Sequence, residues 1–364
     1  MKSKRVVVAM SGGVDSSVAA ALLLDKGHEV IGVTMNLFSL PPDLCRSTEL
    51  RSCCGWRAVE DANEVATKLG LPHLVVDFRR EFEKSVIGDF CTEYRRGRTP
   101  NPCVRCNQHI KFDILLRRAA RLGADFLATG HHSRVVRTRD WIPYHLKKGK
   151  DRAKDQSYFL YTLTQHQLSH LLMPIGGLTK KEVREVARKK GLRVAGKPES
   201  QEVCFVPQGR YPDFLRERIP EAFQPGPILD LDGRLLGEHQ GIVHFTVGQR
   251  RGLRLSSSRP LYVISIDPTD HAVIVGPEDA LLRKQFLASD VSWVSGERLK
   301  DKIWVKAKIR YQHKEAEALV VPFTPDKVVV TFVEPQRAIT PGQSVVFYSR
   351  DEVLGGGIID RVVA

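Results

Sequence analysis

The stretch that decides the fold is residues 6–17, VVVAMSGGVDSS. Apolar residues 6–10 predict a strand, and the pattern of residues 15–26 predicts a helix closed by Gly27. Two adjacent glycines let the backbone turn tightly and expose its N–H groups, while the helix start adds donors and a positive dipole end. The stretch therefore predicts a phosphate-binding loop, although the Gly-Lys-Ser/Thr ending of the Walker loop is missing.

Outward from this loop, the first half of the chain alternates short apolar runs with helical periodicity. Strands are expected at residues 30–35, 74–78 and 126–129, and helices at residues 56–69, 81–96 and 110–122. This alternation indicates an α/β fold with a parallel sheet covered by helices on both faces. A capping box from Thr179 to Glu182 predicts a further helix that ends at Gly191.

The second half has a different texture, because proline and glycine interrupt it after about residue 207. A hairpin is expected at residues 261–275, turned at 268–270. The later apolar runs lie at residues 291–294, 303–310, 316–321, 328–333, 344–348 and 353–359. Short strands without helices predict an antiparallel sandwich or barrel.

Composition excludes some classes of protein. The 364 residues include 56 Lys and Arg against 42 Asp and Glu, a net charge of +14. No apolar run approaches the roughly 18 residues that span a membrane, and the N-terminus does not resemble a signal peptide, so we expect a cytoplasmic protein. Residues 101–200 alone hold 21 basic and 8 acidic residues. Such a block favours a surface that faces nucleic acid, although solvated helix faces, as at residues 180–190, would give the same count.

The seven cysteines lie at positions 45, 53, 54, 91, 103, 106 and 204. An odd count in a cytosolic chain argues against a disulfide framework and favours catalytic, redox or metal-binding thiols. Cys106 follows a proline-stiffened loop, and we expect a helix start, Arg105 and Lys111 to stabilise its thiolate. Cys204 is either its partner or a small core residue beside Phe205, and Cys91 fits an apolar helix face with Ile87 and Phe90.

The strand–SGGxDS–helix pattern resembles the PP-loop ATP pyrophosphatases, which adenylate an oxygen of the substrate and release pyrophosphate. Six further blocks lie at residues 99–111, 128–131, 154–160, 200–205, 248–253 and 355–358. Together with the loop they make the chain similar to the tRNA-specific 2-thiouridylase family over nearly its whole length.

The resemblance implies three domains: a parallel-sheet PP-loop domain related to adenine nucleotide alpha hydrolases at residues 1–207, a small central domain at 208–281, and an antiparallel β-barrel-like domain at 282–364. It implies ATP-dependent 2-thiolation of the wobble uridine of lysine, glutamate and glutamine tRNAs. ATP would adenylate the C2 oxygen, and persulfide sulfur would replace it with loss of AMP. The expected partners are tRNA and a sulfur donor, either a cysteine desulfurase or a relay protein, with no DNA and no membrane.

Carried over position by position, the resemblance also implies site residues. Cys106 would be the catalytic cysteine and Cys204 the persulfide carrier. The nucleotide would contact Ala9, Met10, Ser11, Gly12, Gly13, Val14, Asp15, Ser16, Met35 and Gly130. The tRNA would contact Asn101, Pro102, Cys103, His131, Lys154, Asp155, Gln156, Arg310, Tyr311 and Gln343. Without the family, Met35 would be a core residue, Arg310 and Tyr311 an exposed strand end, and His131 part of a solvated loop.

Two metal hypotheses accompany this interpretation. Asp15 is placed to orient the phosphates or their Mg²⁺. At Cys103 the family often has aspartate, so Cys103, Cys106 and Cys204 offer the three thiolates of an iron–sulfur cluster with one open iron. A structural zinc is disfavoured because no second CxxC accompanies Cys103 and Cys106.

Two other function classes compete with the thiouridylase. One is a different PP-loop enzyme, such as an amide-forming ligase or a cytidine thiolase, which would lack cysteines in this arrangement or carry further CxxC pairs. The other is a non-enzymatic RNA-binding protein that uses the basic block. The intact phosphate-binding loop argues against a protein that only binds RNA, because such a protein needs no ATP site.

Overall fold

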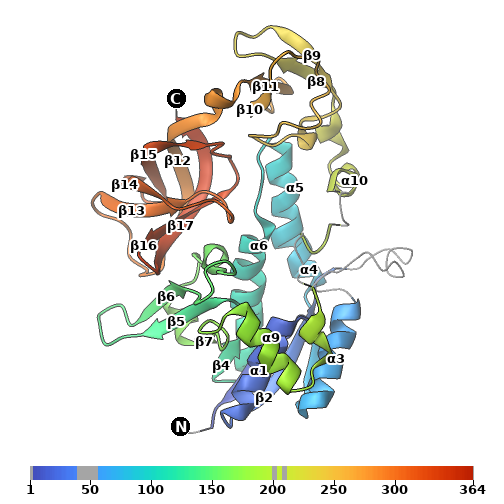
Figure 1. Ribbon diagram of the computed structural model, residues 1–364, viewed down its shortest axis with the longest axis vertical. Coiled ribbons are helices and arrows are strands. Elements are labelled where there is room, and N and C mark those ends of the chain that lie inside the picture. Colours follow the sequence, from blue (N-terminus) through green and yellow to red (C-terminus); the bar gives the residue numbers. More distant parts are fainter. Residues whose placement is uncertain (1–2, 39–55, 199–202, 207–210, 364) are drawn as a thin grey trace.

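The computed structural model describes residues 3–38, 56–198, 203–206 and 211–363. Three sheets follow one another along its long axis (Figure 1). Cys45, Cys53 and Cys54 lie outside the described residues. No helix in the described ranges is long and apolar enough to cross a membrane.

The first sheet is parallel, as the sequence predicts, with strand order β3-β2-β1-β4-β7. Its strands are β1 (Arg5–Ala9), β2 (Glu29–Asn36), β3 (His73–Asp77), β4 (Phe126–Ala128) and β7 (Leu171–Leu172). The chain builds outward from β1 to β3 and then returns to the other side of β1 for β4. The carboxyl ends of β1 and β4 therefore adjoin where the strand order reverses, the usual place for a ligand crevice in an open α/β sheet.

Helices cover both faces of this sheet because successive strand residues point to opposite sides. One face packs on α1 (Val14–Asp25), α3 (Trp56–Leu69) and α9 (Lys180–Lys189). The other face packs on two longer helical segments. These are α4 (Arg79–Phe82), η1 (Glu83–Ile87) and α5 (Gly88–Arg95), then α6 (Pro102–Arg105), η2 (Cys106–Leu115) and α7 (Leu116–Arg121). Cys91 is buried with Ile87 and Phe90, which confirms the predicted apolar face.

The helix that carries the paired cysteines begins eight residues earlier than the predicted start at residue 110. Pro102 occupies its first turn, and the Asn101 side chain accepts a hydrogen bond from the Val104 N–H at 3.4 Å. Both residues favour a helix start at this point. Cys103 is therefore helical rather than part of a loop, and Cys106 lies beyond the first turn. The expected stabilisation of the Cys106 thiolate stays a prediction.

The central region forms a second sheet of four strands. They are β8 (Gly226–Leu229), β9 (Leu235–His239), β10 (Tyr262–Asp267) and β11 (Ala272–Gly276). The last two form the predicted hairpin. Gly97, just after α5, has a φ of +65°, and a Cβ there would lie 2.8 Å from the Ile266 side chain. The end of the long helical segment therefore fits closely against this sheet (Figure 1).

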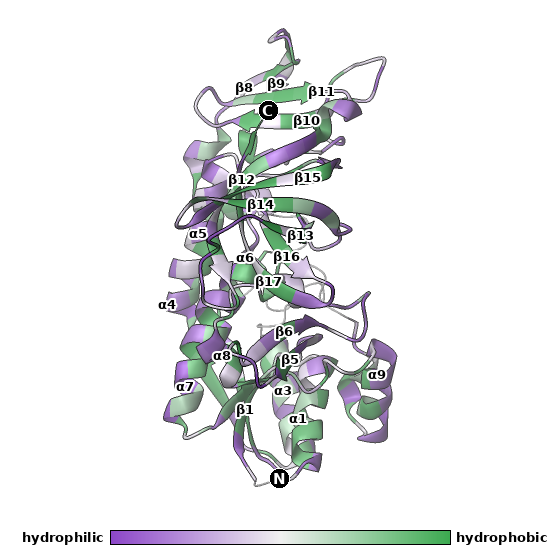
Figure 2. Ribbon diagram, turned by 90° about the vertical axis from the view of Figure 1, so that its left-hand side faces the viewer, coloured by the Kyte–Doolittle hydropathy of each residue, from purple (hydrophilic) through white to green (hydrophobic). Residues whose placement is uncertain are grey.

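The C-terminal region forms the predicted antiparallel barrel. Its strands are β12 (Leu282–Trp293), β13 (Ile303–Lys308), β14 (Ala316–Thr324), β15 (Lys327–Arg337), β16 (Ser344–Ser349) and β17 (Glu352–Val363). Pairing of β12 with β17 closes the barrel. Figure 2 shows hydrophobic stretches along the barrel strands.

The barrel also receives a hairpin from the N-terminal half that the sequence did not predict. Strands β5 (Ser133–Arg137) and β6 (Tyr144–Lys148) pair with each other, and β6 pairs with β17 at Lys147 and Glu352. Both strands are rich in basic residues, so they lack the apolar run used to recognise strands. The hairpin joins the segment after β4 to the barrel.

Candidate nucleotide and cysteine site

The loop between β1 and α1 has a tightly determined backbone. Gly12 has a φ of +63°, and a Cβ on it would lie 2.5 Å from the carbonyl oxygen of Ala58. The Ser11 N–H donates to Ser16 Oγ at 3.2 Å, and the Ser16 and Ser17 hydroxyls donate to the Gly13 carbonyl at 3.2 and 2.8 Å. Gly13 is the N-cap of α1 and has no side chain to cap it. The helix start is thus arranged for an external anion.

The segment after β4 closes the other side of this loop. A Cβ on Gly130 would lie 2.5 Å from the Ser16 nitrogen and 2.6 Å from the Asp15 carbonyl carbon. The Thr129 hydroxyl and His131 Nδ1 share a hydrogen bond of 2.8 Å. Burial lowers the pKa of His131 well below its usual range, and the nearby charge of Lys111 lowers it further. The imidazole is therefore neutral beside the loop.

Asp15 lies at the centre of a charged cluster in the first turn of α1. Lys180 Nζ donates to both carboxylate oxygens at 2.8 and 2.7 Å, and His132 Nε2 lies 3.2 Å from Oδ1. Burial alone would raise the pKa of Asp15, but the hydrogen bonds from His132 and Lys180 outweigh it and lower the pKa. The carboxylate is therefore ionised and fixed in direction.

Gln156 holds His132 in this cluster. The Gln156 side-chain oxygen accepts a hydrogen bond from the His132 backbone N–H at 3.0 Å. The Gln156 backbone N–H donates to the His132 carbonyl at 3.0 Å. His132 is only 2% exposed. Gln156, expected to contact tRNA, thus also supports the phosphate loop.

Two lysines at the loop were missed by the sequence analysis. Lys180 was considered only as part of the basic block, facing either nucleic acid or solvent, yet it is 9% exposed and bound to Asp15. Lys197 Nζ donates to the Gly12 carbonyl at 2.9 Å and pairs with Asp61 of α3. The Thr179 capping box is confirmed and fixes the start of α9. Local sequence alone does not show that the first residue of α9 meets Asp15, 165 positions away.

Three family models match successive parts of the chain. Residues 4–208 match the model of a tRNA methyl transferase HUP domain, 212–277 a tRNA methyl transferase PRC-barrel domain, and 283–359 an aminomethyltransferase β-barrel domain. The chain is 51% identical over 361 residues to the tRNA-specific 2-thiouridylase 1 of Caldanaerobacter subterraneus, covering 99% of both chains. The corresponding protein of Carboxydothermus hydrogenoformans is 51% identical over 358 residues, covering 98% of both. The chain belongs to the tRNA-specific 2-thiouridylase family.

In this thiouridylase the helix of Cys106 is joined to the barrel. Arg105 pairs with Asp89 of α5 at 3.3 Å and with Asp290 of β12 at 3.1 Å. The Asn107 amide donates to the Phe159 carbonyl at 3.1 Å. Cys106 itself is 8% exposed and belongs to the core cluster that also contains Ala9, at the end of β1. The catalytic-cysteine candidate and the strand that leads into the loop therefore share one core.

The barrel also supports the loop before this helix. The Gln343 amide donates to the carbonyls of Thr99 and Pro100 at 2.9 and 3.3 Å, and the Thr99 N–H donates to the Pro341 carbonyl at 2.9 Å. Gln343 was expected to contact tRNA. In the structure its side chain also holds the backbone just before the tRNA-contact candidates Asn101 and Pro102.

Cys204 lies in a turn at residues 203–206 and is partly buried. Phe205 anchors this turn through edge-on contacts with Phe82 and Phe90, with ring centroids 5.5 and 5.3 Å apart. Cys204 packs against the same core cluster as Cys106, so its position fits both the core role and the reactive role.

The hypothesis of a three-thiol cluster finds no support in this arrangement. Within the described ranges, which include Cys103, Cys106 and Cys204, no three Cys, His, Asp or Glu side chains gather so as to hold a metal ion. Cys103 is exposed whereas Cys106 is buried. The Asp15 carboxylate, the Mg²⁺ candidate, is occupied by Lys180 and His132.

The remaining tRNA-contact candidates are divided between surface and interior. Asp155 is 7% exposed and accepts the Gly149 N–H at 2.9 Å and the Ser157 hydroxyl at 2.7 Å, so it holds the loop of Lys154 in shape. The Arg310 guanidinium donates to the Arg337 carbonyl, and Tyr311 packs on Phe159 with ring centroids 4.6 Å apart.

Met35, which was expected to contact the nucleotide, is buried in the core cluster.

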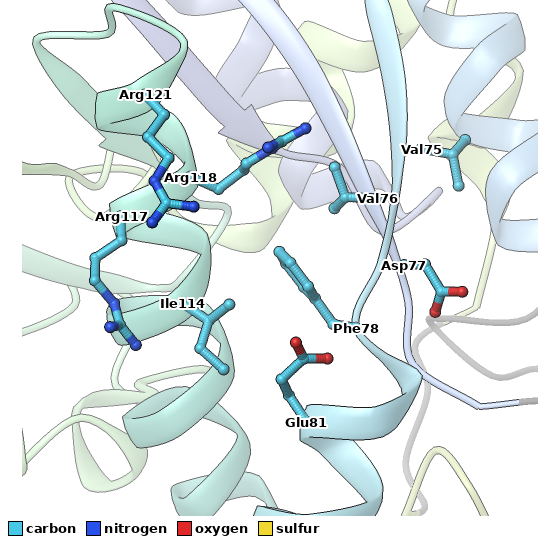
Figure 3. Close-up of a pocket in the computed structure, with 9 residues that line it drawn as sticks. All are labelled: Val75, Val76, Asp77, Phe78, Glu81, Ile114, Arg117, Arg118 and Arg121. Carbon is cyan, nitrogen blue, oxygen red and sulfur yellow. The ribbon is translucent and has the colours of Figure 1, made fainter.

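The structure also contains a cavity of about 530 Å³ on another part of the first domain, beside the edge strand β3 (Figure 3). Arg117, Arg118 and Arg121 of the η2–α7 segment line one side, and Glu81 lies opposite. Arg117 pairs with Asp113 at 2.8 Å. None of the described residues that line this cavity belongs to the phosphate loop or is a cysteine, so cavity size does not identify the nucleotide site.

Proposed function

We propose that this chain converts the wobble uridine of lysine, glutamate and glutamine tRNAs to 2-thiouridine in an ATP-dependent reaction. Membership of the thiouridylase family supports the reaction class. The observation that carries the nucleotide assignment is the fit of Gly130 against Ser16, which joins two strand ends into one phosphate-binding cradle. Open α/β sheets bind nucleotides at such a point.

In the first step, the C2 oxygen of uracil attacks the α-phosphorus of ATP, the bond to the β-phosphate breaks, and pyrophosphate leaves. The loop from Ala9 to Ser16 supplies backbone donors to the phosphates, and Met35 and Gly130 flank the nucleotide. Lys197 fixes the peptide between Gly12 and Gly13 through the Gly12 carbonyl. Fixed donors of this kind stabilise charge without reorganising during the reaction.

In the second step, the terminal sulfur of a persulfide on Cys204 attacks C2, and AMP leaves with the former C2 oxygen. Cys106 then attacks the remaining disulfide link to Cys204, which releases the thiocarbonyl on the base. The resulting Cys106–Cys204 disulfide is reduced by an external thiol. The persulfide comes from a cysteine desulfurase or a relay protein. Mg²⁺ and an iron–sulfur cluster stay predictions, and no step is assigned to either.

The target base must leave the anticodon stack to reach these groups. Asn101, Pro102 and Cys103 are placed at the start of the Cys106 helix and are proposed to meet the base. His131, Lys154, Asp155, Gln156, Arg310, Tyr311 and Gln343 remain proposed tRNA contacts, of which Asp155, Gln156 and Gln343 also have the supporting bonds described above.

Replacing Lys154 with alanine is expected to weaken tRNA binding and to reduce the slope of log affinity against log salt by about one unit, because one phosphate contact is lost. Filter binding between low and moderate salt measures this slope. Lys300→Ala removes an exposed charge outside the basic block and serves as the matched control. An unchanged slope in Lys154→Ala would assign Lys154 to the solvated surface instead.

Nucleoside analysis separates this function from its nearest rivals. Purified protein is incubated with ATP, a persulfide donor and unmodified tRNA, and the digested tRNA is analysed by mass spectrometry. We expect 2-thiouridine only. Thiolated cytidine would indicate a cytidine thiolase, and tRNA binding without any sulfur incorporation would indicate a pure RNA-binding protein.

A further inference from the structure

The phosphate loop contains no cation of its own. Residues 10–17 include one charged side chain, the acidic Asp15, and the lysine of the Walker loop is missing. Transfer of a nucleotidyl group leaves negative charge on pyrophosphate, and enzymes stabilise such charge with lysine, arginine or metal ions. The loop therefore needs a cation that comes from elsewhere in the chain.

Lys180 is placed to be that cation. It is the first residue of α9, and its ammonium lies against Asp15 in the first turn of α1, where the helix dipole already favours an anion. Three features fix this position: the Thr179 capping box starts the helix, the Asp151 carboxylate accepts a hydrogen bond from the Lys180 backbone N–H at 3.0 Å, and the Lys180 ammonium binds Asp15.

The surroundings of Lys180 distinguish it from an ordinary surface lysine. Its side chain is 11% exposed, whereas the neighbouring Lys181 belongs to the exposed residues. A buried ion pair is a weak source of stability because desolvation offsets most of the attraction. Because this ion pair lies at the end of α1 that favours anions, ligand binding explains the position of Lys180 better than stability does. An ammonium can also bind a phosphate oxygen while it neutralises the adjacent carboxylate.

We propose that Lys180 is a further catalytic residue, whose ammonium binds the β- and γ-phosphates of ATP and stabilises the pyrophosphate as it leaves. This inference rests on the proposed ATP reaction. The bond between the α-phosphorus and the bridging oxygen breaks, the electron pair stays with pyrophosphate, and Lys180 remains protonated throughout. Lys180 thus supplies from α9 the charge that the loop itself lacks.

The test compares a triphosphate with a monophosphate by titration calorimetry, using α,β-methylene ATP and AMP. Lys180→Met is expected to weaken α,β-methylene ATP binding about 10- to 100-fold, the range for a hydrogen bond between charged groups. AMP binding should change little, because AMP lacks the β- and γ-phosphates. Lys180→Arg should retain part of the triphosphate affinity, and Lys181→Met should bind both nucleotides as the wild type does.

A second pair of variants distinguishes direct contact of Lys180 with the phosphates from neutralisation of the Asp15 charge by Lys180. It also avoids a variant in which the Asp15 carboxylate stays buried without its lysine partner. In the Asp15→Asn background, adding Lys180→Met should still weaken α,β-methylene ATP binding relative to Asp15→Asn alone. Equal affinities in that pair would overturn the proposal, as would a parallel loss of AMP and triphosphate affinity in Lys180→Met. A wild-type protein that binds neither nucleotide would contradict the ATP reaction itself.

Discussion

Replacing Cys204 or Cys106 with serine is expected to lower tRNA thiolation by about 1000-fold or more, as when an essential nucleophile is removed. A hydroxyl cannot carry persulfide sulfur or cleave a disulfide. Binding of tRNA and ATP-dependent release of pyrophosphate should persist in both variants, because neither step uses a thiol. The mobility of thiolated tRNA in mercury-containing gels measures the first quantity, and a coupled phosphate assay measures the second.

Cys91→Ala is the matched control for these variants. Cys91 is 7% exposed and packs on the apolar face of the same helical segment as Phe90, so its removal should cost some stability but no activity. Full thiolation in Cys204→Ser would remove the persulfide role. Loss of pyrophosphate release together with thiolation would mean that the thiols act before adenylation.

Cys103→Ser, tested in iron-free protein, distinguishes the persulfide route from the cluster hypothesis. The exposed position of Cys103 and the absence of a three-ligand group among the described side chains favour the persulfide route, so we expect substantial activity. The cluster would be supported by two results together. Cys103→Ser would be inactive, and the iron-free wild type would regain activity only when iron and sulfide are added.

Gly13→Ala is expected to lower ATP-dependent thiolation by about 100-fold or more while it leaves the fold intact. The Cβ would project from the N-cap of α1, where the phosphates are proposed to bind, yet the nearest protein atom would be Ser11 Oγ at 3.4 Å. The free chain can therefore accommodate the methyl group. ATP titration and the thiolation assay, together with the melting temperature, separate the two effects.

Gly177→Ala is the control for this variant, because a Cβ there would meet no atom within 4 Å. Gly12→Ala and Gly130→Ala are less informative, since their Cβ atoms would collide with backbone at 2.5 Å and disturb the loop itself. Normal thiolation by a folded Gly13→Ala protein would contradict the phosphate-loop assignment.

The sequence predicted much of the fold because its main elements are marked locally. The apolar runs of β1, β2 and β3 and the capping box of α9 are short-range signals, and the structure confirms them. The β5–β6 hairpin was missed because SRVVR and YHLKK are largely basic and are strands only through pairing with each other and with β17. Long-range pairing of this kind leaves no periodic pattern in the strand itself.

The site was predictable only in part for the same reason. The glycines and serines of the phosphate loop are contiguous, whereas Lys180 and Lys197 meet it from 165 and 185 positions away. Gln156 and Gln343 were expected to face tRNA, and the structure shows that their amides also bind the backbone of His132 and Thr99. A list of site residues carried over from a family does not distinguish residues that contact the substrate from residues that hold those contacting residues in place.

The central claim is tested most directly by a single turnover with Cys204 loaded as a persulfide whose terminal sulfur is an isotopic label. The loaded protein is mixed with ATP and unmodified glutamate tRNA, without any further sulfur donor. We predict that the label appears at C2 of the wobble uridine with one AMP and one pyrophosphate formed per sulfur transferred. Label that stays on the protein while ATP is consumed, or sulfur that reaches tRNA without ATP, would contradict the account.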